Sequence, residues 1–272
     1  GHSNLTSRML SSVKASDGRI AVLVHDVIPL EHPDWQKTGS VEKFRDKIAC
    51  VGALADLVIH TSCDGQRRVE QSMQSIGRVP LGVVAYQGVE PAYPDPAQLP
   101  QGLPPERPYF VAVGTIEPRK NINLLLDVWD DLGPDAPPLL ICGCRGWRND
   151  ALFARLDALP AHGPVREVPN LSDPALSALI QGAVALLFPS LAEGFGRPPV
   201  EAATLGTTTL CANLDVYQEV LGNKIVYVDG LDRYSWSSAV TKMIREQCSP
   251  SENPAFEPLK WTDHFKVVLR LT

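Results

Sequence analysis

The chain contains 272 residues, of which 44% are hydrophobic and 21% are charged, and its formal net charge is −6. These values are ordinary for a soluble globular protein with one large or two modest domains. The negative balance excludes a basic footprint for nucleic acid, and no apolar run approaches the roughly 18 residues that a membrane span requires. We therefore expect a cytoplasmic protein whose association with membranes is at most peripheral.

Three apolar runs in the first hundred residues predict strands. Residues 4–18 are polar, with at most a helix fragment before the turn Asp17-Gly18. The expected strands are Arg19–His25, Leu57–Ser62 and Gly82–Tyr86, and the expected helices are Val41–Leu54 and a segment from Ser62 or Asp64 through Met73. Seven prolines then follow between Pro91 and Pro108 without a periodic pattern. They predict a linker and a division of the chain near residue 100.

Strands and helices alternate regularly beyond this linker, which predicts a parallel, doubly wound sheet. The expected strands are Tyr109–Val113, Leu139–Cys142, Val165–Val168, Val184–Phe188, Thr207–Cys211 and Ile225–Val228. The expected helices are Asn121–Leu132, Asn149–Leu159, Asp173–Gln181, Pro199–Leu205, Val216–Leu221, Asp232–Gln247 and a last amphipathic helix over Pro258–Leu271.

The six cysteines show no Cys-x-x-Cys spacing. Cys50, Cys63 and Cys211 lie in apolar or strand-like contexts, where reduced thiols are common. The segment Cys142-Gly-Cys144 lacks the histidine or second cysteine pair of a zinc site. We expect free thiols, Cys248 included, and no bound metal ion.

The first strand of the second half ends in Gly114 and is followed by Arg119 and Lys120 before a helix. The partial positive charge of a helix N-terminus, a planar guanidinium and an ammonium group together suit a diphosphate. Taken alone, the pair is better explained as a solvated Arg-Lys dipeptide on a loop. It therefore predicts a phosphate site only in combination with a second motif.

The second motif, residues 190–202, places Glu193 and Glu201 on either side of a Gly-Phe-Gly turn. A helix is expected to open behind the turn, at Pro198 or Pro199. Carboxylates accept hydrogen bonds from vicinal hydroxyls, so Glu193 suits a hexose and Glu201 a ribose. The alternatives are an exposed loop acid for Glu193 and charge compensation at the helix N-terminus for Glu201. Both motifs follow expected strands, so they can converge on one ligand.

Two segments resemble the retaining family-four (group 1) glycosyltransferases of the GT-B fold. They are Val113-Gly-Thr-Ile-Glu-Pro-Arg119-Lys120-Asn-Ile and Phe188-Pro-Ser-Leu-Ala-Glu193-Gly-Phe-Gly-Arg-Pro-Pro-Val-Glu201-Ala. The resemblance implies that Arg119 and Lys120 bind the donor diphosphate, that Glu193 contacts the donor sugar and that Glu201 contacts the ribose. It implies further contacts with the donor from three places: the glycine of the first segment, the amides of the turn in the second segment, and the segment that faces the nucleotide base. These residues are Gly114, Gly194, Phe195, Gly196 and Asn170.

The segment Val24-His25-Asp26-Val-Ile-Pro29 resembles the His-Asp-x-x-Pro segment of bacterial mannosyl- and rhamnosyl-type members of that family. The resemblance implies that His25 approaches the donor sugar from the other domain and orients it. His25 thus joins Arg119, Lys120 and Glu193 as a candidate catalytic residue. The alternative is a structural histidine at a strand end.

The expected fold is α/β of the GT-B type, with two Rossmann-like domains on parallel sheets. We assign residues 1–100 to a partial, acceptor-side domain, residues 101–255 to the donor-binding domain, and residues 256–272 to a helix that can cross back to the first domain. Two full domains of about 150 residues each would need some 300 residues, and the family's early glycine-rich loop has no match here. We therefore expect the N-terminal domain to be incomplete.

The expected function is transfer of a hexose from a GDP- or UDP-linked donor to an acceptor hydroxyl, with retention of configuration, in bacterial polysaccharide or glycoconjugate synthesis. The expected partners are the nucleotide sugar and a saccharide or lipid-linked saccharide acceptor. No Asp-x-Asp motif occurs, so no cofactor is expected. The alternatives are a non-catalytic module that binds a nucleotide sugar or a partner, a sugar-nucleotide epimerase, and a phosphorylase-like protein, for which no pyridoxal lysine context is recognised.

Overall fold

The computed structural model describes residues 5–228, 232–246, 256–258 and 260–271. Contacts divide the chain into two compact units. The first contains Gly1–Gly88, Glu193–Phe195 and Leu259–Thr272, and the second contains Val89–Ala192 and Gly196–Pro258. Cys248 and the predicted helix end at Gln247 lie outside the described residues.

The first unit is built on a three-stranded parallel sheet, sheet A, in the order β1-β2-β3. The strands are β1 (Ala21–Val24), β2 (Leu57–His60) and β3 (Leu81–Val84). Val24 pairs with His60 and His60 with Val84, so the three strands end together. The helices are α1 (Ser7–Ala15), α2 (Ile28–Glu31), the 3-10 helix η2 (Pro33–Trp35), α3 (Ser40–Leu54), α4 (Cys63–Ile76) and α11 (Trp261–Val268).

Both faces of sheet A are covered. Val22, Val24 and Val58 belong to one apolar cluster with residues of α1, α3 and α4. On the other face, Ile59 and Ala85 pack with Val268 of α11. Alternating β-branched residues fit this sandwich, because successive side chains of a strand point to opposite faces.

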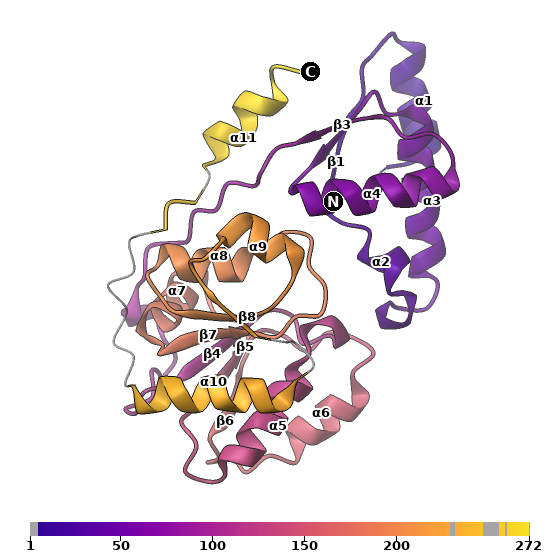
Figure 1. Ribbon diagram of the computed structural model, residues 1–272. Coiled ribbons are helices and arrows are strands. Elements are labelled where there is room, and N and C mark those ends of the chain that lie inside the picture. The colour runs from indigo at the N-terminus through magenta and orange to yellow at the C-terminus, as the bar shows by residue number, and fades with distance from the viewer. Residues whose placement is uncertain (1–4, 229–231, 247–255, 259, 272) are drawn as a thin grey trace. The chain divides into compact units, whose positions relative to one another are not determined.

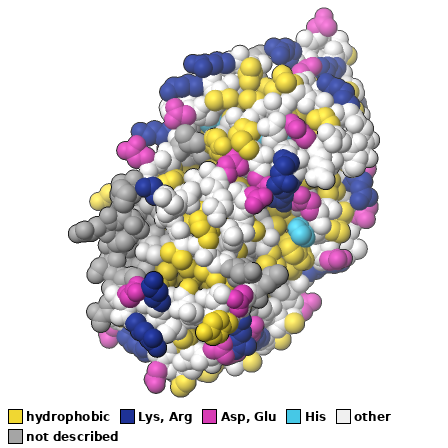
Figure 2. All heavy atoms as spheres, in the orientation of Figure 1, with side chains coloured by type: hydrophobic (Ala, Val, Ile, Leu, Met, Phe, Trp, Pro, Cys, Tyr) yellow, Lys and Arg dark blue, Asp and Glu magenta, His cyan; other side chains and the backbone are white. Residues whose placement is uncertain are grey.

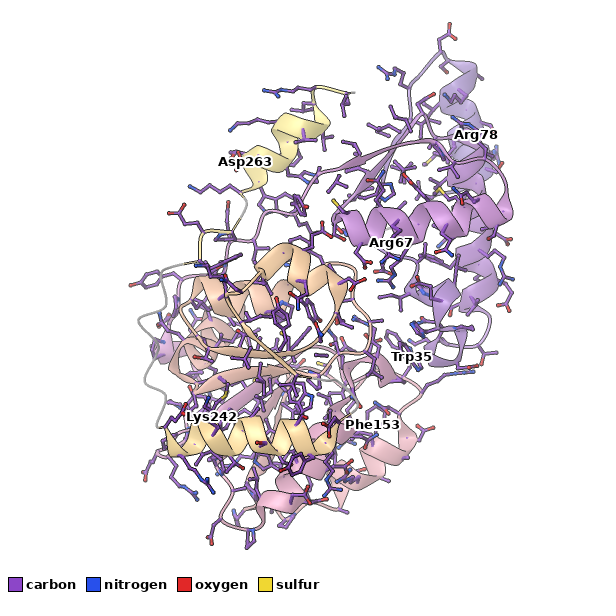
Figure 3. The ribbon with its side chains drawn as sticks, in the orientation of Figure 1. Trp35, Arg67, Arg78, Phe153, Lys242 and Asp263 are labelled. Carbon is purple, nitrogen blue, oxygen red and sulfur yellow. The ribbon has the colours of Figure 1, made fainter. Side chains whose placement is uncertain are left out.

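Side chains fix the helix ends of the first unit. The N-cap hydroxyl of α4, Ser62 Oγ, accepts a hydrogen bond of 2.9 Å from the amide of Gly65. Behind α4, Arg78 (Figure 3) donates through Nη1 to the carbonyls of Gly52 and Ala55 at the end of α3, at 3.1 and 2.9 Å. These bonds satisfy carbonyls that a helix leaves unpaired at its last turn.

The second unit contains a six-stranded parallel sheet, sheet B, in the order β6-β5-β4-β7-β8-β9. Its strands are β4 (Phe110–Val113), β5 (Leu139–Cys142), β6 (Val165–Val168), β7 (Ala185–Phe188), β8 (Thr209–Ala212) and β9 (Val226–Val228). Its helices are η3 (Pro96–Gln98), η4 (Pro118–Lys120), α5 (Ile122–Leu132), α6 (Asp150–Asp157), α7 (Asp173–Gly182), α8 (Arg197–Thr204), α9 (Asp215–Leu221) and α10 (Arg233–Arg245).

Helices cover both faces of sheet B, with α5, α6 and α10 on one side and α7, α8 and α9 on the other (Figure 1). The α5/α10 face holds a buried cluster that includes Phe110, Leu125, Trp129 and Trp236. Phe110 and Trp129 meet edge to face at 5.6 Å between ring centroids. Strands buried on both faces read as continuous apolar runs, which is why the sequence located β5 (Leu-Leu-Ile-Cys) to the residue.

The predicted α/β class with parallel sheets is confirmed, and the first sheet has three strands against six in the second. Helix ends differ from the expected ones by up to three residues, as in α11, and two of the differences lie in the motif loops. The helix of the second motif begins at Arg197, one residue before the first proline, because Gly196 in the left-handed region (φ 87°) already turns the chain. Asn121 is not helical: it lies in the left-handed region (φ 51°) between η4 and α5.

Candidate functional site

The two sequence motifs follow adjacent strands, β4 and β7. Phe110 pairs with Ala185 and Val111 with Leu186. From β4 the chain builds outward through β5 and β6 on one side, and through β7, β8 and β9 on the other. The order of strands therefore reverses between β4 and β7, and in doubly wound sheets ligands bind in the crevice at the carboxyl ends of such a pair.

Hydrogen bonds join the two loops that follow these strands. The amide of Leu191 donates to the carbonyl of Arg119 at 2.8 Å. In return, Arg119 Nη1 donates to the carbonyl of Ala192 at 3.2 Å. The loop after β4 and the loop after β7 thus form one wall within the second unit.

Lys120 is almost fully buried in this wall, with 7% of its surface exposed. Its Nζ lies 4.3 Å from the ring centroid of Phe188, the last residue of β7. A Cβ on Gly114 would come within 3.1 Å of Lys120 Cε, so glycine leaves room for the lysine stem. A buried ammonium over an aromatic face is held by the ring quadrupole, and its low-dielectric surroundings strengthen its attraction for an anion.

Arg119 makes a different set of contacts from its neighbour. Its Nε lies 2.6 Å from Oε1 of Glu117, whose exposed fraction is 6%. The amide of Lys120 donates to the Glu117 carbonyl at 3.0 Å and closes the η4 turn. Glu117 was not among the candidates chosen from sequence, although it lies two residues before Arg119 in the motif.

The second motif places Glu201 in the middle of α8, where its side chain is 19% exposed. Arg197 Nη2 donates to its Oε1 at 3.0 Å, one helical turn away. Gly196, the N-cap of α8, lies against Tyr217, and a Cβ there would approach Tyr217 Cε1 to 2.4 Å. Only glycine fits this entry to the helix.

Ser190 is a site residue that sequence reasoning did not select. It is fully buried directly behind β7, and its Oγ has no hydrogen-bond partner among the residues that the structure describes. A buried hydroxyl without a partner is costly. The Ser190 hydroxyl can therefore bind a polar ligand or a water molecule at the carboxyl end of sheet B.

Asn170 lies two residues beyond β6, in the left-handed conformation (φ 59°). Its Oδ1 accepts a hydrogen bond of 3.2 Å from Sγ of Cys144, behind β5. Asn170 thus belongs to the same carboxyl edge of sheet B as Gly114. This contact joins the loops behind β5 and β6, on the side of β4 away from β7.

Glu193, Gly194 and Phe195 group with the first unit. There the carbonyl of Gly194 accepts a hydrogen bond of 3.2 Å from Ser62 Oγ. A Cβ on Gly194 would come within 2.8 Å of the His25 carbonyl. The backbone of the turn thus lies against the backbone of His25, an exposed residue directly after β1.

Arg68 on α4 is a further contact that the sequence did not reveal. Its Nη1 donates to the Glu193 carbonyl at 3.0 Å, and its guanidinium pairs with Glu31 and Asp64. The hydrogen bond to Glu31 is the main cause that raises the pKa of Arg68 above its ordinary value. This network fixes the backbone before the Gly-Phe-Gly turn, and a helical arginine far from the motif in sequence gives no signal of it.

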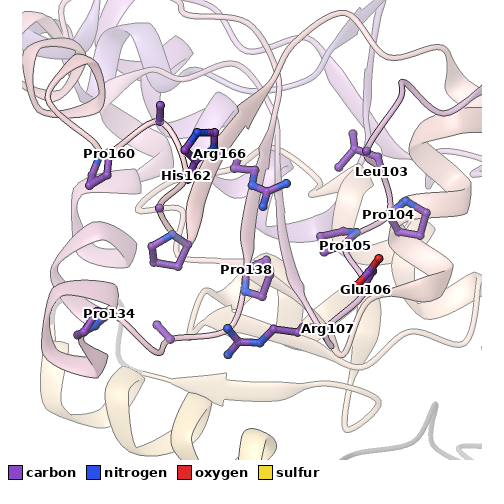
Figure 4. A pocket seen from close by; sticks show the side chains of 15 residues that line it. Leu103, Pro104, Pro105, Glu106, Arg107, Pro134, Pro138, Pro160, His162 and Arg166 are labelled. Carbon is purple, nitrogen blue, oxygen red and sulfur yellow. The ribbon is translucent and has the colours of Figure 1, made fainter.

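A cavity of about 870 Å³ lies at the opposite, amino-terminal end of sheet B (Figure 4). It is lined by residues before β4, β5 and β6, among them Pro105, Pro138 and His162, and by Arg166 near the start of β6. None of the predicted site residues lines it. We place the candidate site at the carboxyl ends instead, because the buried charges and the unpartnered Ser190 hydroxyl lie there.

Basic and acidic side chains are interspersed on the face drawn in Figure 2. Among the described residues, no helix has the length and apolar character needed to cross a bilayer. In the same part of the chain, no three side chains of His, Cys, Asp or Glu gather as metal ligands do, and Cys50, Cys63, Cys142, Cys144 and Cys211 are free thiols.

Comparison with known families and proteins gives a consistent result. Residues 97–254 match the family described as Glycosyl transferases group 1. A serotype-specific mannosyltransferase WbdA of Escherichia coli is 27% identical over 93% of this chain, and an O-antigen chain mannosyltransferase B of Escherichia coli is 31% identical over 51% of it. The chain spans 33% and 37% of the lengths of these two relatives.

The fold is similar to those of solved glycosyltransferase structures. Anabaena Alr3699/HepE in complex with UDP and glucose superposes with a TM-score of 0.75 at 17% identity, over 98% of this chain and 76% of that chain. Sucrose-phosphate synthase from Thermosynechococcus elongatus gives a TM-score of 0.74 at 16% identity, over 97% and 70%. The expected GT-B fold is thereby confirmed.

Proposed function

This chain belongs to the group 1 glycosyl transferases, and we propose that it transfers a hexose from a nucleotide-diphosphate sugar to an acceptor hydroxyl with retention of configuration. The observation that carries the proposal is the contact between the two motif loops at the strand reversal between β4 and β7. Catalytic machinery for this chemistry consists mainly of groups that stabilise the departing diphosphate.

The proposed donor site follows from the chemistry of the wall. Lys120 and Arg119 supply positive charge for the diphosphate, and the amides at Gly194, Phe195 and Gly196 supply donors for sugar and phosphate oxygens. Glu201 would accept hydrogen bonds from the ribose hydroxyls. Its ion pair with Arg197 is exposed, so water and a sugar hydroxyl can compete for the carboxylate at small cost.

The proposed reaction breaks the bond between the anomeric carbon and the diphosphate oxygen, and forms a bond from the acceptor oxygen on the same face. The acceptor proton passes to the departing phosphate. Glu193 would hold the hexose hydroxyls and His25 would orient the sugar. We propose that no metal ion takes part, so a chelator is expected to leave turnover unchanged.

The nature of donor and acceptor is supported by the relatives. Relatives named WbdA, O-antigen chain mannosyltransferase B and O-antigen chain mannosyltransferase RfbU act, by name, as mannosyltransferases. We therefore favour mannose as the hexose, a saccharide or lipid-linked saccharide as the acceptor, and a cytoplasmic location with at most peripheral membrane association. The UDP-glucose bound in a structure of Alr3699/HepE supports a nucleotide-diphosphate donor.

Calorimetry with GDP and UDP tests the donor site. The wild-type chain is expected to bind one of the two, and an Arg119→Ala/Lys120→Ala variant to bind it about 100-fold more weakly, or about 2.7 kcal/mol. A Lys242→Ala/Arg245→Ala variant is the matched control, because it removes the same charge from the exposed surface of α10. Failure of the folded wild-type chain to bind either nucleotide would end the proposal.

A second candidate is a module that binds the nucleotide sugar without transferring it, motivated by a first sheet of three strands. Incubation with GDP-mannose or UDP-glucose and an oligosaccharide acceptor separates the two. Release of nucleoside diphosphate with an α-linked product, read by NMR, supports the transferase with retention. Tight binding without product supports the module, and epimerised donor in the absence of acceptor would support an epimerase.

A further inference from the structure

We propose that Glu117 is a positioning residue that holds Arg119 as a brace between the two motif loops, so that direct contact with the donor diphosphate falls to Lys120. The inference rests on the proposed function, because it concerns the same donor site. It separates two adjacent cations to which the family resemblance assigns one common role.

The guanidinium of Arg119 is engaged on two sides by its own wall. Nε faces Glu117 Oε1 at 2.6 Å, and Nη1 donates to the Ala192 carbonyl at 3.2 Å. The Arg119 carbonyl accepts the Leu191 amide at 2.8 Å. Side chain and backbone of this residue therefore both tie the loop behind β4 to the loop behind β7.

Glu117 and Arg119 form a partly buried pair, with side chains 8% and 23% exposed. A carboxylate that is removed from water stays charged only with a well-placed partner. The same pairing neutralises the guanidinium and fixes its plane. A phosphate that approached Arg119 would therefore meet a guanidinium whose charge is already shared with Glu117.

Lys120 is directed elsewhere in the wall. Residues of a 3-10 turn are rotated by about 120° from one to the next, so neighbours face different sides. Its stem lies against Gly114, and its ammonium lies over the Phe188 ring at the end of β7. These contacts place Lys120 at the carboxyl end of the strand pair, where the diphosphate is proposed to bind.

The two assignments predict different effects of salt on nucleotide binding by the Arg119→Ala variant. If Arg119 only braces the loops, Glu117→Ala and Arg119→Ala both misplace the wall and both weaken nucleotide binding, by about tenfold, the scale of orienting contacts. The double variant Glu117→Ala/Arg119→Ala is then no weaker than either single variant. If Arg119 contacts phosphate directly, Arg119→Ala also lowers the salt dependence of nucleotide binding, as Lys120→Ala does, whereas loss of a brace that Glu117 neutralises leaves the salt dependence at its wild-type value.

The experiment is a double-variant cycle, with affinity for GDP and UDP measured by calorimetry on the full chain. Glu117→Gln keeps an acceptor oxygen for Arg119 and is expected to restore affinity to within about twofold of wild type. Lys120→Ala is expected to lose affinity by about tenfold or more, and its remaining binding is expected to depend less on salt. Arg233→Ala and Asp131→Ala remove an exposed Arg-carboxylate pair and serve as the matched control.

Tighter or unchanged binding in Glu117→Ala overturns the proposal, and so do additive losses in the double variant. If the alanine variants do not fold, Arg119→Lys replaces Arg119→Ala. The Glu117→Gln variant is then expected to bind the nucleotide more tightly than the Arg119→Lys variant. The reverse order overturns the proposal. Urea unfolding of the same four proteins without nucleotide measures the coupling of Glu117 and Arg119 independently. A wild type that binds no nucleotide contradicts the proposed function, whereas zero coupling contradicts the brace alone.

Discussion

The two parallel sheets of this protein differ in the order of their strands. Sheet A runs in chain order, β1-β2-β3, whereas sheet B reverses between β4 and β7. The helices after β4 and β7, α5 and α8, lie on opposite faces of the sheet, and such a reversal leaves a crevice at the strand ends (Figure 1). Charged and polar groups are collected at that crevice: Glu117, Arg119, Lys120 and Ser190. Both units have parallel strands, and the strand order of sheet B produces the candidate binding wall of the second unit.

The buried polar groups of the two units also differ in kind. In the second unit, Glu117 is paired with Arg119, and Lys120 lies over an aromatic ring. In the first unit, the buried His60 has no hydrogen-bond partner for either ring nitrogen among the described residues. In the second unit, the arrangement keeps the positive charge of Lys120 at the carboxyl ends of the strands, where an anion can bind. In the first unit, the buried imidazole ring of His60 must be neutral. The two units should therefore respond differently to substitution and to acid.

The largest expected effect concerns the backbone of the crevice. A Cβ on Gly143 would lie 2.1 Å from the Gly114 carbonyl oxygen, so Gly143→Ala must push two strand ends apart. We expect a loss of about 3 kcal/mol in the free energy of unfolding, together with weaker nucleotide binding. Gly82→Ala in the first unit is the matched control. Its Cβ meets the mobile ends of Glu70 and Gln66, and we expect a loss of at most about 1 kcal/mol. Equal losses in urea unfolding would contradict the comparison.

Acid should affect the first unit through His60. Burial lowers the pKa of His60 to about 4 from 6.5, and Glu70 opposes this shift. A depressed histidine pKa means that the unfolded chain binds the proton first, so stability is complete above pH 6.5 and falls as the pH drops toward 4. At pH 5 the loss is about 2 kcal/mol. His60→Leu should flatten this part of the urea-unfolding profile, whereas His162→Leu, at an exposed site of the second unit, should leave it unchanged. If the loss of unfolding free energy in acid persists in His60→Leu, other groups cause it.

The N-caps of two helices, one in each unit, allow a comparison with a smaller expected effect on stability. Ser62 Oγ caps α4 and is fully buried, with a second bond to the Gly194 carbonyl. Ser172 Oγ caps α7 and bonds to Gln98 at an exposed position. We expect Ser62→Ala to cost about 1.5 kcal/mol and Ser172→Ala about 0.7 kcal/mol in urea unfolding. The reverse order would show that burial does not strengthen the Ser62 cap.

Much of sheet B and the meeting of its two motif loops could be predicted from sequence. Strands buried on both faces are continuous apolar runs, and parallel strands bring their carboxyl ends to one edge. Glu117 illustrates what could not be predicted. Its pairing with Arg119 depends on the η4 turn and on Asn121 in the left-handed region, and neither has a periodic pattern.

Long-range contacts escaped sequence reasoning for a related reason. Arg68 reaches the Glu193 carbonyl across 125 positions of the chain. Ser190 becomes significant because its buried hydroxyl has no hydrogen-bond partner within the described part of the chain. Charge and spacing along the chain carry no information about such contacts. The start of α8 was placed one or two residues late because proline dominated the sequence signal, whereas Gly196 sets the turn.

The smallest expected effect separates Arg197 from the two cations of the wall. Arg197 is the third cation of the motif loops, but its side chain is 54% exposed and pairs with Glu201 within one helical turn. Exposed pairs of this kind contribute about 0.5 kcal/mol or less. We therefore expect Arg197→Ala to leave the unfolding midpoint and the affinity for GDP or UDP almost unchanged, in contrast to Lys120→Ala. A loss as large as that of Lys120→Ala would add Arg197 to the phosphate site, because an ion pair so exposed has no stabilising role large enough to explain it.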